Sequence, residues 1–205
     1  MKRLYLLFLL TANFLPAQKI VEKSIINPDI RAISLDVTNN FKVSVSTVAG
    51  NEMLLEASID GEYSKDLLVN VAQSGNTLLV STGFSPNFVK PNDKLSAHKV
   101  ISIALKVSLP ERKSVSIYGT GCHVAASGDY EMLKISLSDG RCNLKNIRGS
   151  AKVSTQSGSI SVLAESAKIK ALSKYGHVGK NHIPLGDTFY DISSVTGDII
   201  LDKIE

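Results

Sequence analysis

The chain has 205 residues, with 23 lysines and arginines against 19 aspartates and glutamates, and a formal net charge of +4 at pH 7. This near-neutral balance argues against nucleic acid and other strongly charged partners. Tryptophan is absent and only 6% of the residues are aromatic, which argues against a deep sugar-binding cleft lined by aromatic rings.

The first residues have the pattern of a secretory signal peptide. Lys2 and Arg3 precede a short apolar run over residues 4–10, and Ala17 lies before the polar Gln18. We predict a signal peptide over residues 1–17 and export to the periplasm, the outer surface or the medium. A membrane anchor is the alternative, but the apolar run is short for a bilayer core of about 30 Å. No later segment is predicted to span a membrane.

Residues 18–205 are predicted to form one domain, with a strand-rich first half over 18–110 and a repeat region over 111–205. The first half shows apolar residues at alternate positions, which is the pattern of half-buried strands. These runs are residues 33–37, 41–45, 53–59, 67–71, 78–80 and 101–109. Ser85–Ala97 reads as a long loop. The first half is predicted to extend or cap the repeats.

Five glycines recur in the second half at steps of 19, 18, 18 and 21 residues: Gly121, Gly140, Gly158, Gly176 and Gly197. Each lies between two short alternating runs. A period of this length, built only of strands, predicts a right-handed parallel β-helix or β-roll-like solenoid with rungs of about 18–20 residues. Glycine suits the turn between strands because a positive φ is cheap without a Cβ.

Alignment of the repeats places apolar residues in two inward columns, spaced about 4.8 Å apart from rung to rung. One column is Val115, Ile135, Val153, Ala171 and Ile192, and the other is Cys122, Cys142, Ile160, Val178 and Ile199. Ser173, Ser194 and Lys180 stand where apolar residues are expected. We therefore expect the last rungs to be less tightly packed.

The two cysteines, Cys122 and Cys142, align one rung apart and point the same way. In-register neighbours in adjacent rungs lie within the Cα separation that a disulfide needs, and an exported chain permits oxidation. A disulfide is one prediction, and two buried free thiols are the other.

The stretch from Ile33 to Leu201 resembles the secreted, adhesin-like β-strand-repeat proteins of Bacteroidetes-type bacteria, which are related to auto-transporter adhesin head domains. The segments that carry the resemblance are Phe41–Val45, Ser108–Pro110 with Val115–Gly119, Ser138–Gly140, Thr155–Ile160 and Val195–Ile199. The resemblance implies an adhesin-like fold and supplies no catalytic residues.

Chemistry-bearing residues are scattered. His98, His123, His177 and His182 are not placed as a catalytic group, and Asp139, Asp187, Asp191 and Asp198 read chiefly as turn residues. No catalytic residue, metal site or cofactor is predicted.

An outward column of lysines is the candidate ligand face. Lys134, Lys152 and Lys170 are spaced 18 residues apart, and Tyr118, Gln156 and Lys174 lie beside them. The functional interpretation is a polar, positive surface for an acidic polysaccharide or another envelope component. The alternative is a solvated face on which lysines oppose aggregation.

The sequence thus favours a non-catalytic, exported binding module that resembles an adhesin, with a glycan or another cell-surface component as its partner. A polysaccharide-acting β-helix enzyme, and a periplasmic accessory protein in envelope signalling or surface assembly, are the alternatives.

Overall fold

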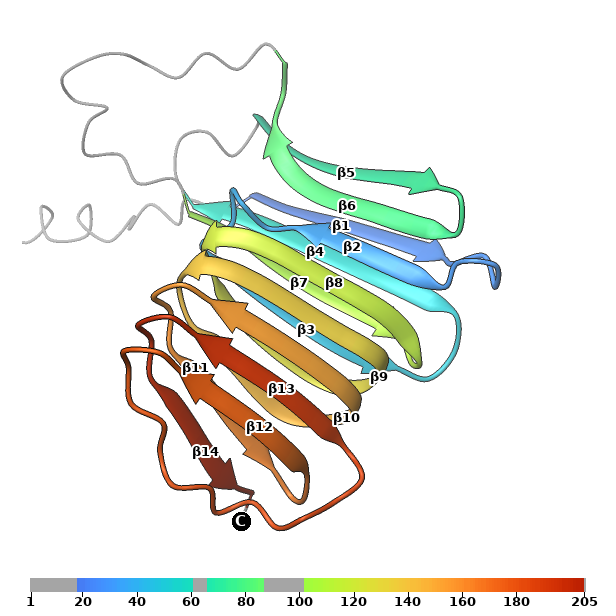
Figure 1. Cartoon of the computed structure of the whole chain (residues 1–205). Coiled ribbons are helices and arrows are strands. Elements are labelled where there is room, and N and C mark those ends of the chain that lie inside the picture. Colours follow the sequence, from blue (N-terminus) through green and yellow to red (C-terminus); the bar gives the residue numbers. More distant parts are fainter. Residues whose placement is uncertain (1–17, 61–65, 87–101, 205) are drawn as a thin grey trace, which may run out of the picture.

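The computed structural model describes residues 18–60, 66–86 and 102–204. The secondary-structure elements in these ranges are all β-strands (Figure 1). The strands are β1 (Gln18–Ile25), β2 (Ala32–Asp36), β3 (Lys42–Val48), β4 (Glu52–Asp60), β5 (Leu67–Ser74), β6 (Thr77–Phe84), β7 (Ser102–Pro110), β8 (Lys113–Gly121), β9 (His123–Asp139), β10 (Cys142–Thr155), β11 (Ile160–Ala164), β12 (Lys168–Ser173), β13 (Phe189–Ser194) and β14 (Ile199–Lys203). The predicted signal peptide and residues 87–97 of the predicted loop lie outside the described residues.

All of these strands belong to one mixed sheet. Pairing is antiparallel between β1 and β4, between β4 and β7, and within the β5–β6 hairpin. The other ladders are parallel, including every ladder from β8 to the C-terminus. The sheet is therefore antiparallel only in its N-terminal part.

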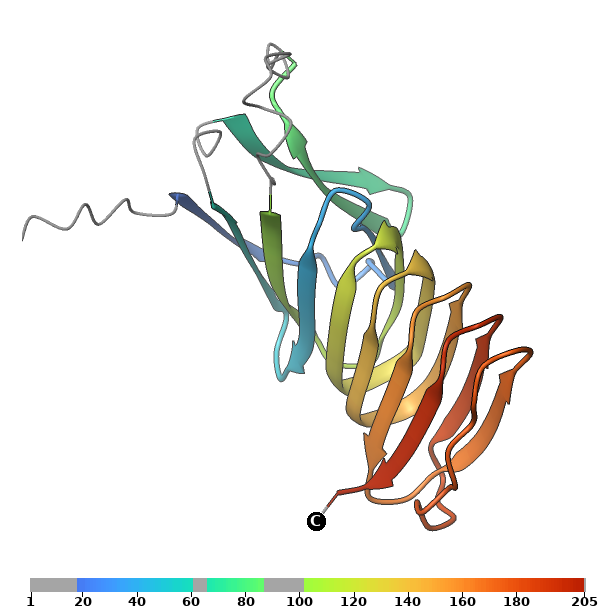
Figure 2. The same cartoon turned by 90° about the vertical axis from the view of Figure 1, so that its left-hand side faces the viewer.

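Two long strands fold the sheet back over itself, as Figure 2 shows. The first residues of β9 pair with β3, whereas its later residues pair with β8 on the opposite layer. In the same way, β10 pairs first with β11 and then with β13. Each strand bends at a glycine with positive φ, Gly128 at 116° and Gly149 at 92°. Other residues rarely adopt this backbone conformation.

The hydrophobic core lies between the two layers. Because successive side chains of a strand point to opposite faces, alternate apolar residues of both layers meet inside. Ile117, Ile135, Val153 and Ile192 face one another in adjacent rungs, and each is at most 1% exposed. Burial of one such side chain stabilises the fold by about 1.5–3 kcal/mol.

Two buried tyrosines hold the bends. The Tyr130 hydroxyl donates to the Ser127 carbonyl at 2.9 Å. The Tyr190 hydroxyl accepts from Ile147 N–H and donates to its carbonyl, both at 3.2 Å. Burial raises the pKa of both, to about 12 for Tyr190, although the Ile147 hydrogen bond lowers it. These hydroxyls satisfy backbone groups where the ladder is irregular.

The rungs do not follow one another in sequence order near the C-terminus. β13 pairs with β10 on one side and with β12 on the other, so it lies between two strands that precede it in the chain. On the opposite layer, β14 pairs with β11, and Val178 bridges to Ile199 beyond it. The predicted sequential stack is wrong at this point.

The prediction of an all-β chain is confirmed, and the sheet as a whole is mixed rather than uniformly parallel. The predicted register also needs a correction of two residues in the first rung. Ile117, not Val115, faces Ile135, and Val124, not Cys122, faces Cys142. A shift of two residues leaves the inward face unchanged, which is why the alternation did not reveal it.

Candidate functional site

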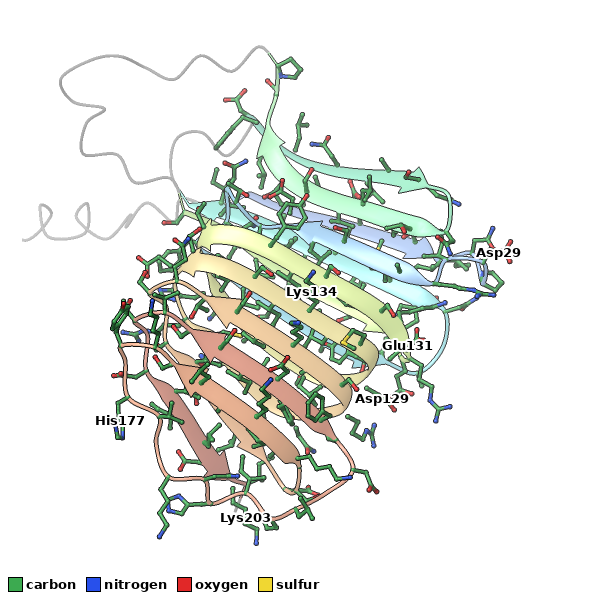
Figure 3. All side chains as sticks on the ribbon, viewed as in Figure 1. Asp29, Asp129, Glu131, Lys134, His177 and Lys203 are labelled. Atoms are coloured by element: carbon green, nitrogen blue, oxygen red, sulfur yellow. The ribbon has the colours of Figure 1, made fainter. Side chains whose placement is uncertain are left out.

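One layer of the sheet consists of β8, the later residues of β9 and β10, and then β13 and β12. The predicted lysine column lies on the outer face of this layer, where Figure 3 shows Lys134, but the column is not continuous. Lys134 faces Lys152 in the ladder of β9 and β10. Because β13 is inserted, Asp191 lies between Lys152 and Lys170. Lys152 Nζ is 3.8 Å from Asp191 Oδ2. Such surface ion pairs contribute roughly 0–1 kcal/mol. The face has mixed charge rather than a stack of cations.

The three residues predicted beside the lysines are not grouped with them. Tyr118 faces Ser136 in the neighbouring outward column and is 46% exposed. Backbone hydrogen bonds place the exposed Val195 between Gln156 and Lys174. The inserted strand β13 therefore interrupts the row of lysines, and the turn after β13 separates Gln156 from Lys174.

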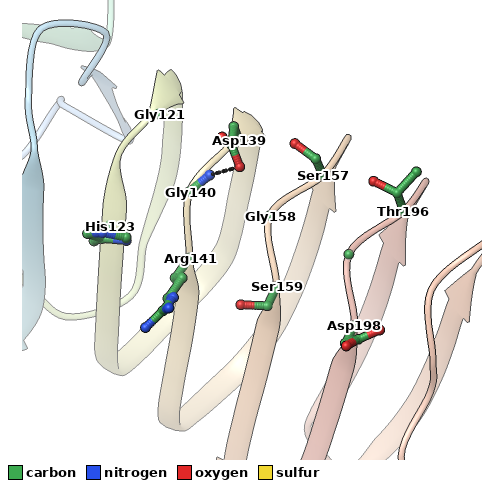
Figure 4. A pocket seen from close by; sticks show the side chains of 11 residues that line it. Gly121, His123, Asp139, Gly140, Arg141, Ser157, Gly158, Ser159, Thr196 and Asp198 are labelled. Atoms are coloured by element: carbon green, nitrogen blue, oxygen red, sulfur yellow. Dashed lines mark hydrogen bonds between the residues drawn. The ribbon is translucent and has the colours of Figure 1, made fainter.

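A groove crosses the stacked turns at the edge of the two layers, and main chain forms its floor (Figure 4). Gly140, Gly158, Gly197 and Gly176 succeed one another in this spatial order. A Cβ on Gly158 would overlap the carbonyl oxygen of Gly140, and a Cβ on Gly197 would overlap that of Gly158. Among these four glycines, only Gly140 has a positive φ, of 107°. Close approach of successive turns, more than left-handed backbone, requires glycine here.

Gly121 is not part of this stack. A Cβ on Gly140 would overlap the backbone of Cys122, so Cys122 occupies the ladder position before Gly140. A Cβ on Gly121 would meet no atom within 4 Å. The recurring glycines thus comprise four that the packing requires and one that it does not.

Polar side chains from successive turns form both walls of the groove, which has a volume of about 490 Å³. Residues just before Gly140, Gly158 and Gly197 form one wall, and residues just after them form the other together with His123, which follows Cys122. The first wall is Asp139, Ser157 and Thr196, and the second is His123, Arg141, Ser159 and Asp198. Backbone hydrogen bonds hold the turns in register. Equivalent side chains therefore repeat about every 4.8 Å.

Both carboxylates of the groove hold backbone amides. Asp139 Oδ1 accepts from Gly140 N–H, and Asp198 Oδ1 accepts from His177 N–H in the next rung, both at 2.7 Å. Thr196 Oγ1 donates to the Gln156 carbonyl at 3.2 Å. The walls are thus tied to the turns that carry them, so the groove is preorganised.

Buried hydroxyls support the floor from below. Thr155 Oγ1 donates to the Gly158 carbonyl at 2.7 Å, and Ser194 Oγ accepts from Gly197 N–H at 2.9 Å. Ser173 plays the same part beside Gly176. The two serines that seemed out of place in an apolar column therefore pin the turns, rather than loosening them. A Ser or Thr lies three residues before Gly158, Gly176 and Gly197, and this spacing is the sequence pattern that could have indicated the supported turns.

The cysteines do not face each other. Cys142 faces Val124, and Cys122 lies two residues earlier along that rung, so the in-register geometry assumed for a disulfide is wrong. Both thiols are free and fully buried. Burial raises the pKa of each to about 12. At neutral pH both are therefore protonated thiols, which are weak nucleophiles.

The histidines within the described ranges are separated. His123 packs edge-to-face on Phe41, with ring centroids 5.2 Å apart, and His182 Nδ1 lies 3.7 Å from Asp202 Oδ1. His98 lies outside the described residues. In residues 18–60, 66–86 and 102–204, no group of three or more His, Cys, Asp or Glu side chains is placed to hold a metal ion.

Comparison with known proteins finds similarity in solved structures alone. A candidate cell adhesion protein from Clostridium sporogenes superposes with a TM-score of 0.61 at 14% identity, over 91% of this chain and 100% of that chain. A candidate adhesin from Bacteroides fragilis gives a TM-score of 0.36 at 13% identity, over 91% and 97% of the two chains. No family model and no curated protein matches. The first likeness shows a shared fold.

Within the part of the chain that the structure describes, no helix has the length and apolar character needed to cross a membrane.

Proposed function

We propose that this protein is a non-catalytic, exported binding module that resembles an adhesin and contacts an extended polar partner along the groove over its stacked turns. The observation that carries the proposal is the groove itself: a main-chain floor with polar side chains repeated on both walls. Rigid stacks that present repeated side chains are suited to long, regular ligands.

The state of the groove carboxylates favours binding over catalysis. A carboxylate that acts as a general acid, base or nucleophile must reach the reacting bond of its substrate. Asp139 and Asp198 each accept a hydrogen bond from a backbone amide, which gives them a structural role in the turn. A polysaccharide-acting enzyme is therefore the second candidate rather than the first.

Export and surface location belong to the same proposal. The predicted signal peptide supports export, and the fold shared with a candidate cell adhesion protein supports a location at the cell envelope. The parallel ladders from β8 onward support our assignment of the C-terminal half as a short right-handed β-solenoid. The lysine face is the alternative contact surface, and it would replace the groove if Lys134→Ala rather than Arg141→Ala weakened binding.

A glycan and extracellular-matrix array, probed with the purified exported chain, tests this proposal. We expect reproducible binding that Arg141→Ala weakens and Lys134→Ala, on the lysine face, leaves unchanged. Absence of binding to every probe would count against a binding module. Chain cleavage of a polysaccharide, lost in Asp139→Asn or Asp198→Asn, would replace the proposal with the enzyme.

A further inference from the structure

We infer that the groove takes a linear, neutral carbohydrate chain, with Tyr175 as a stacking platform one rung beyond Thr196, in the turn after β12; this inference rests on the proposed binding function. It differs from the acidic polysaccharide that the lysine face suggested. The charge of the walls, their repeat and the position of one aromatic ring carry it.

The charges of the groove oppose a polyanion. Arg141 is the one side chain among the lining residues that always carries a positive charge, and Asp139 and Asp198 lie on opposite walls. An acidic chain would meet two carboxylates. A hydroxyl-rich neutral chain can instead donate to these carboxylates and accept from the five N–H groups of the guanidinium.

The direction of the groove requires an extended ligand. Asp139, Ser157 and Thr196 come from three rungs that are adjacent in space, so the wall runs across the strands. Each rung places a polar side chain at the equivalent position of the wall, so these side chains repeat about every 4.8 Å along the groove. A ligand that uses all of them has to be a chain of repeating units, each carrying donors and acceptors.

Tyr175 continues this wall by one rung. Its N–H donates to the Val195 carbonyl, which places it opposite Thr196, and Gly176 then packs against Gly197. The Tyr175 side chain is 70% exposed. Lys174 Nζ lies 4.9 Å from the ring centroid. The ammonium covers one face of the ring and leaves the other for an apolar face of a sugar ring.

The opposite end of the groove also carries a held ring. His123 packs on Phe41 at an interplanar angle of 82°, which fixes the imidazole at the first rung of the groove. The polar walls thus extend from a fixed imidazole to an exposed phenol. This order suits a linear oligosaccharide, whose sugar rings have both polar edges and apolar faces.

Isothermal titration calorimetry of the full exported chain tests the inference. The neutral probes are cellohexaose and N-acetylchitohexaose, and the acidic probes are polygalacturonate and heparin. We expect binding of a neutral chain, weakened at least about tenfold by Tyr175→Ala, which removes the stacking face. Tyr118→Ala is the matched control, because Tyr118 is an exposed tyrosine that does not line the groove, and it should change affinity by less than about twofold. Arg141→Ala gives a second variant within the groove, and circular dichroism verifies that each variant is folded.

Two outcomes would overturn the inference without harming the proposed function. One is binding of the acidic chains alone, weakened by Lys134→Ala or Tyr118→Ala; the other is binding of non-carbohydrate matrix components alone. Absence of binding to all probes, including those of the array, would overturn the inference and the proposed function together.

Discussion

At the scale of single residues, the turns are specified by the backbone of the neighbouring turn and by the buried hydroxyl groups that hold them. Gly158 is required because the neighbouring turn occupies the space of a Cβ, and Thr155 is buried because its hydroxyl holds the Gly158 carbonyl. A buried polar group costs little when it is hydrogen-bonded, so a polar residue in an apolar column need not loosen the packing. The pattern Ser/Thr-x-x-Gly therefore describes a structural unit of these rungs.

Gly158→Ala should destabilise the protein by about 1–3 kcal/mol, since its Cβ would overlap the Gly140 carbonyl and force the turns apart. Gly121→Ala is the control, because its Cβ meets open space. Urea denaturation of both variants measures the difference in unfolding free energy. Equal stabilities would show that the turns do not approach as closely as described.

The two thiols should be free and protected in the native protein. We expect a thiol reagent at pH 8 to label neither Cys122 nor Cys142 before unfolding and to label both after unfolding without reductant, because both are buried and unpaired. Mass spectrometry counts the labels. If the unfolded, unreduced chain took up no label, a disulfide would be present and the register would have to change.

Alkaline pH should lower stability. Burial raises the pKa of both thiols to about 12 in the folded chain, above the ordinary value of 9.0, so the folded chain retains protons that the unfolded chain releases. Their contribution is complete below about pH 9 and is lost as the pH rises toward 12. The unfolding free energy should therefore fall between about pH 9 and pH 12, and less steeply in Cys122→Ala/Cys142→Ala. An identical slope in that variant would mean that other groups dominate.

At the scale of elements, alternation decides which face of each strand is buried. Val153 lies between Ile135 and Ile192 and is fully buried, whereas its chain neighbour Lys152 is on the outer face. The sequence alone indicates this division, because apolar and polar residues alternate with the period of a strand. Alternation does not decide between registers that differ by two residues.

Val153→Asp should unfold the protein or destabilise it by more than about 3 kcal/mol, since it places an unpaired carboxylate in the core. Lys152→Glu should change the unfolding free energy by at most about 1 kcal/mol, because it removes one exposed ion pair. Thermal melting followed by circular dichroism compares the two. Comparable melting temperatures for both variants would mean that the inward column has been misassigned.

At the scale of the whole molecule, the inserted β13 sets the order of the last rungs. Tyr190 faces Ala151 on β10, so a large side chain packs beside a small one, and its hydroxyl bonds with the backbone of Ile147. On its other side, Tyr190 faces Ile169 of β12. These specific contacts, rather than the order of the chain, select the neighbour of β10.

Removal of residues 189–205 deletes β13 and β14 and should also release β12, because β12 pairs with β13 in the described ladders. We expect trypsin to cleave the truncated chain at Lys168, Lys170 and Lys174 much faster than the full chain, while Lys134 in the central rungs remains protected. Mass spectrometry of the digest identifies the sites. Unchanged protection of β12 would favour a stack in sequence order.

Local patterns were sufficient to predict the strand class, the buried faces and the stacked turns, because alternation and glycine spacing are local properties of the chain. Four features depend on contacts between distant segments: the neighbours of β13, the register of the cysteines, the break in the lysine column at Asp191 and the groove at Arg141 and Asp198. Strands with the same alternation can stack in several orders and in registers two residues apart at similar cost in local structure. The choice among them depends on contacts such as Tyr190 with Ile147, which join residues far apart in the chain.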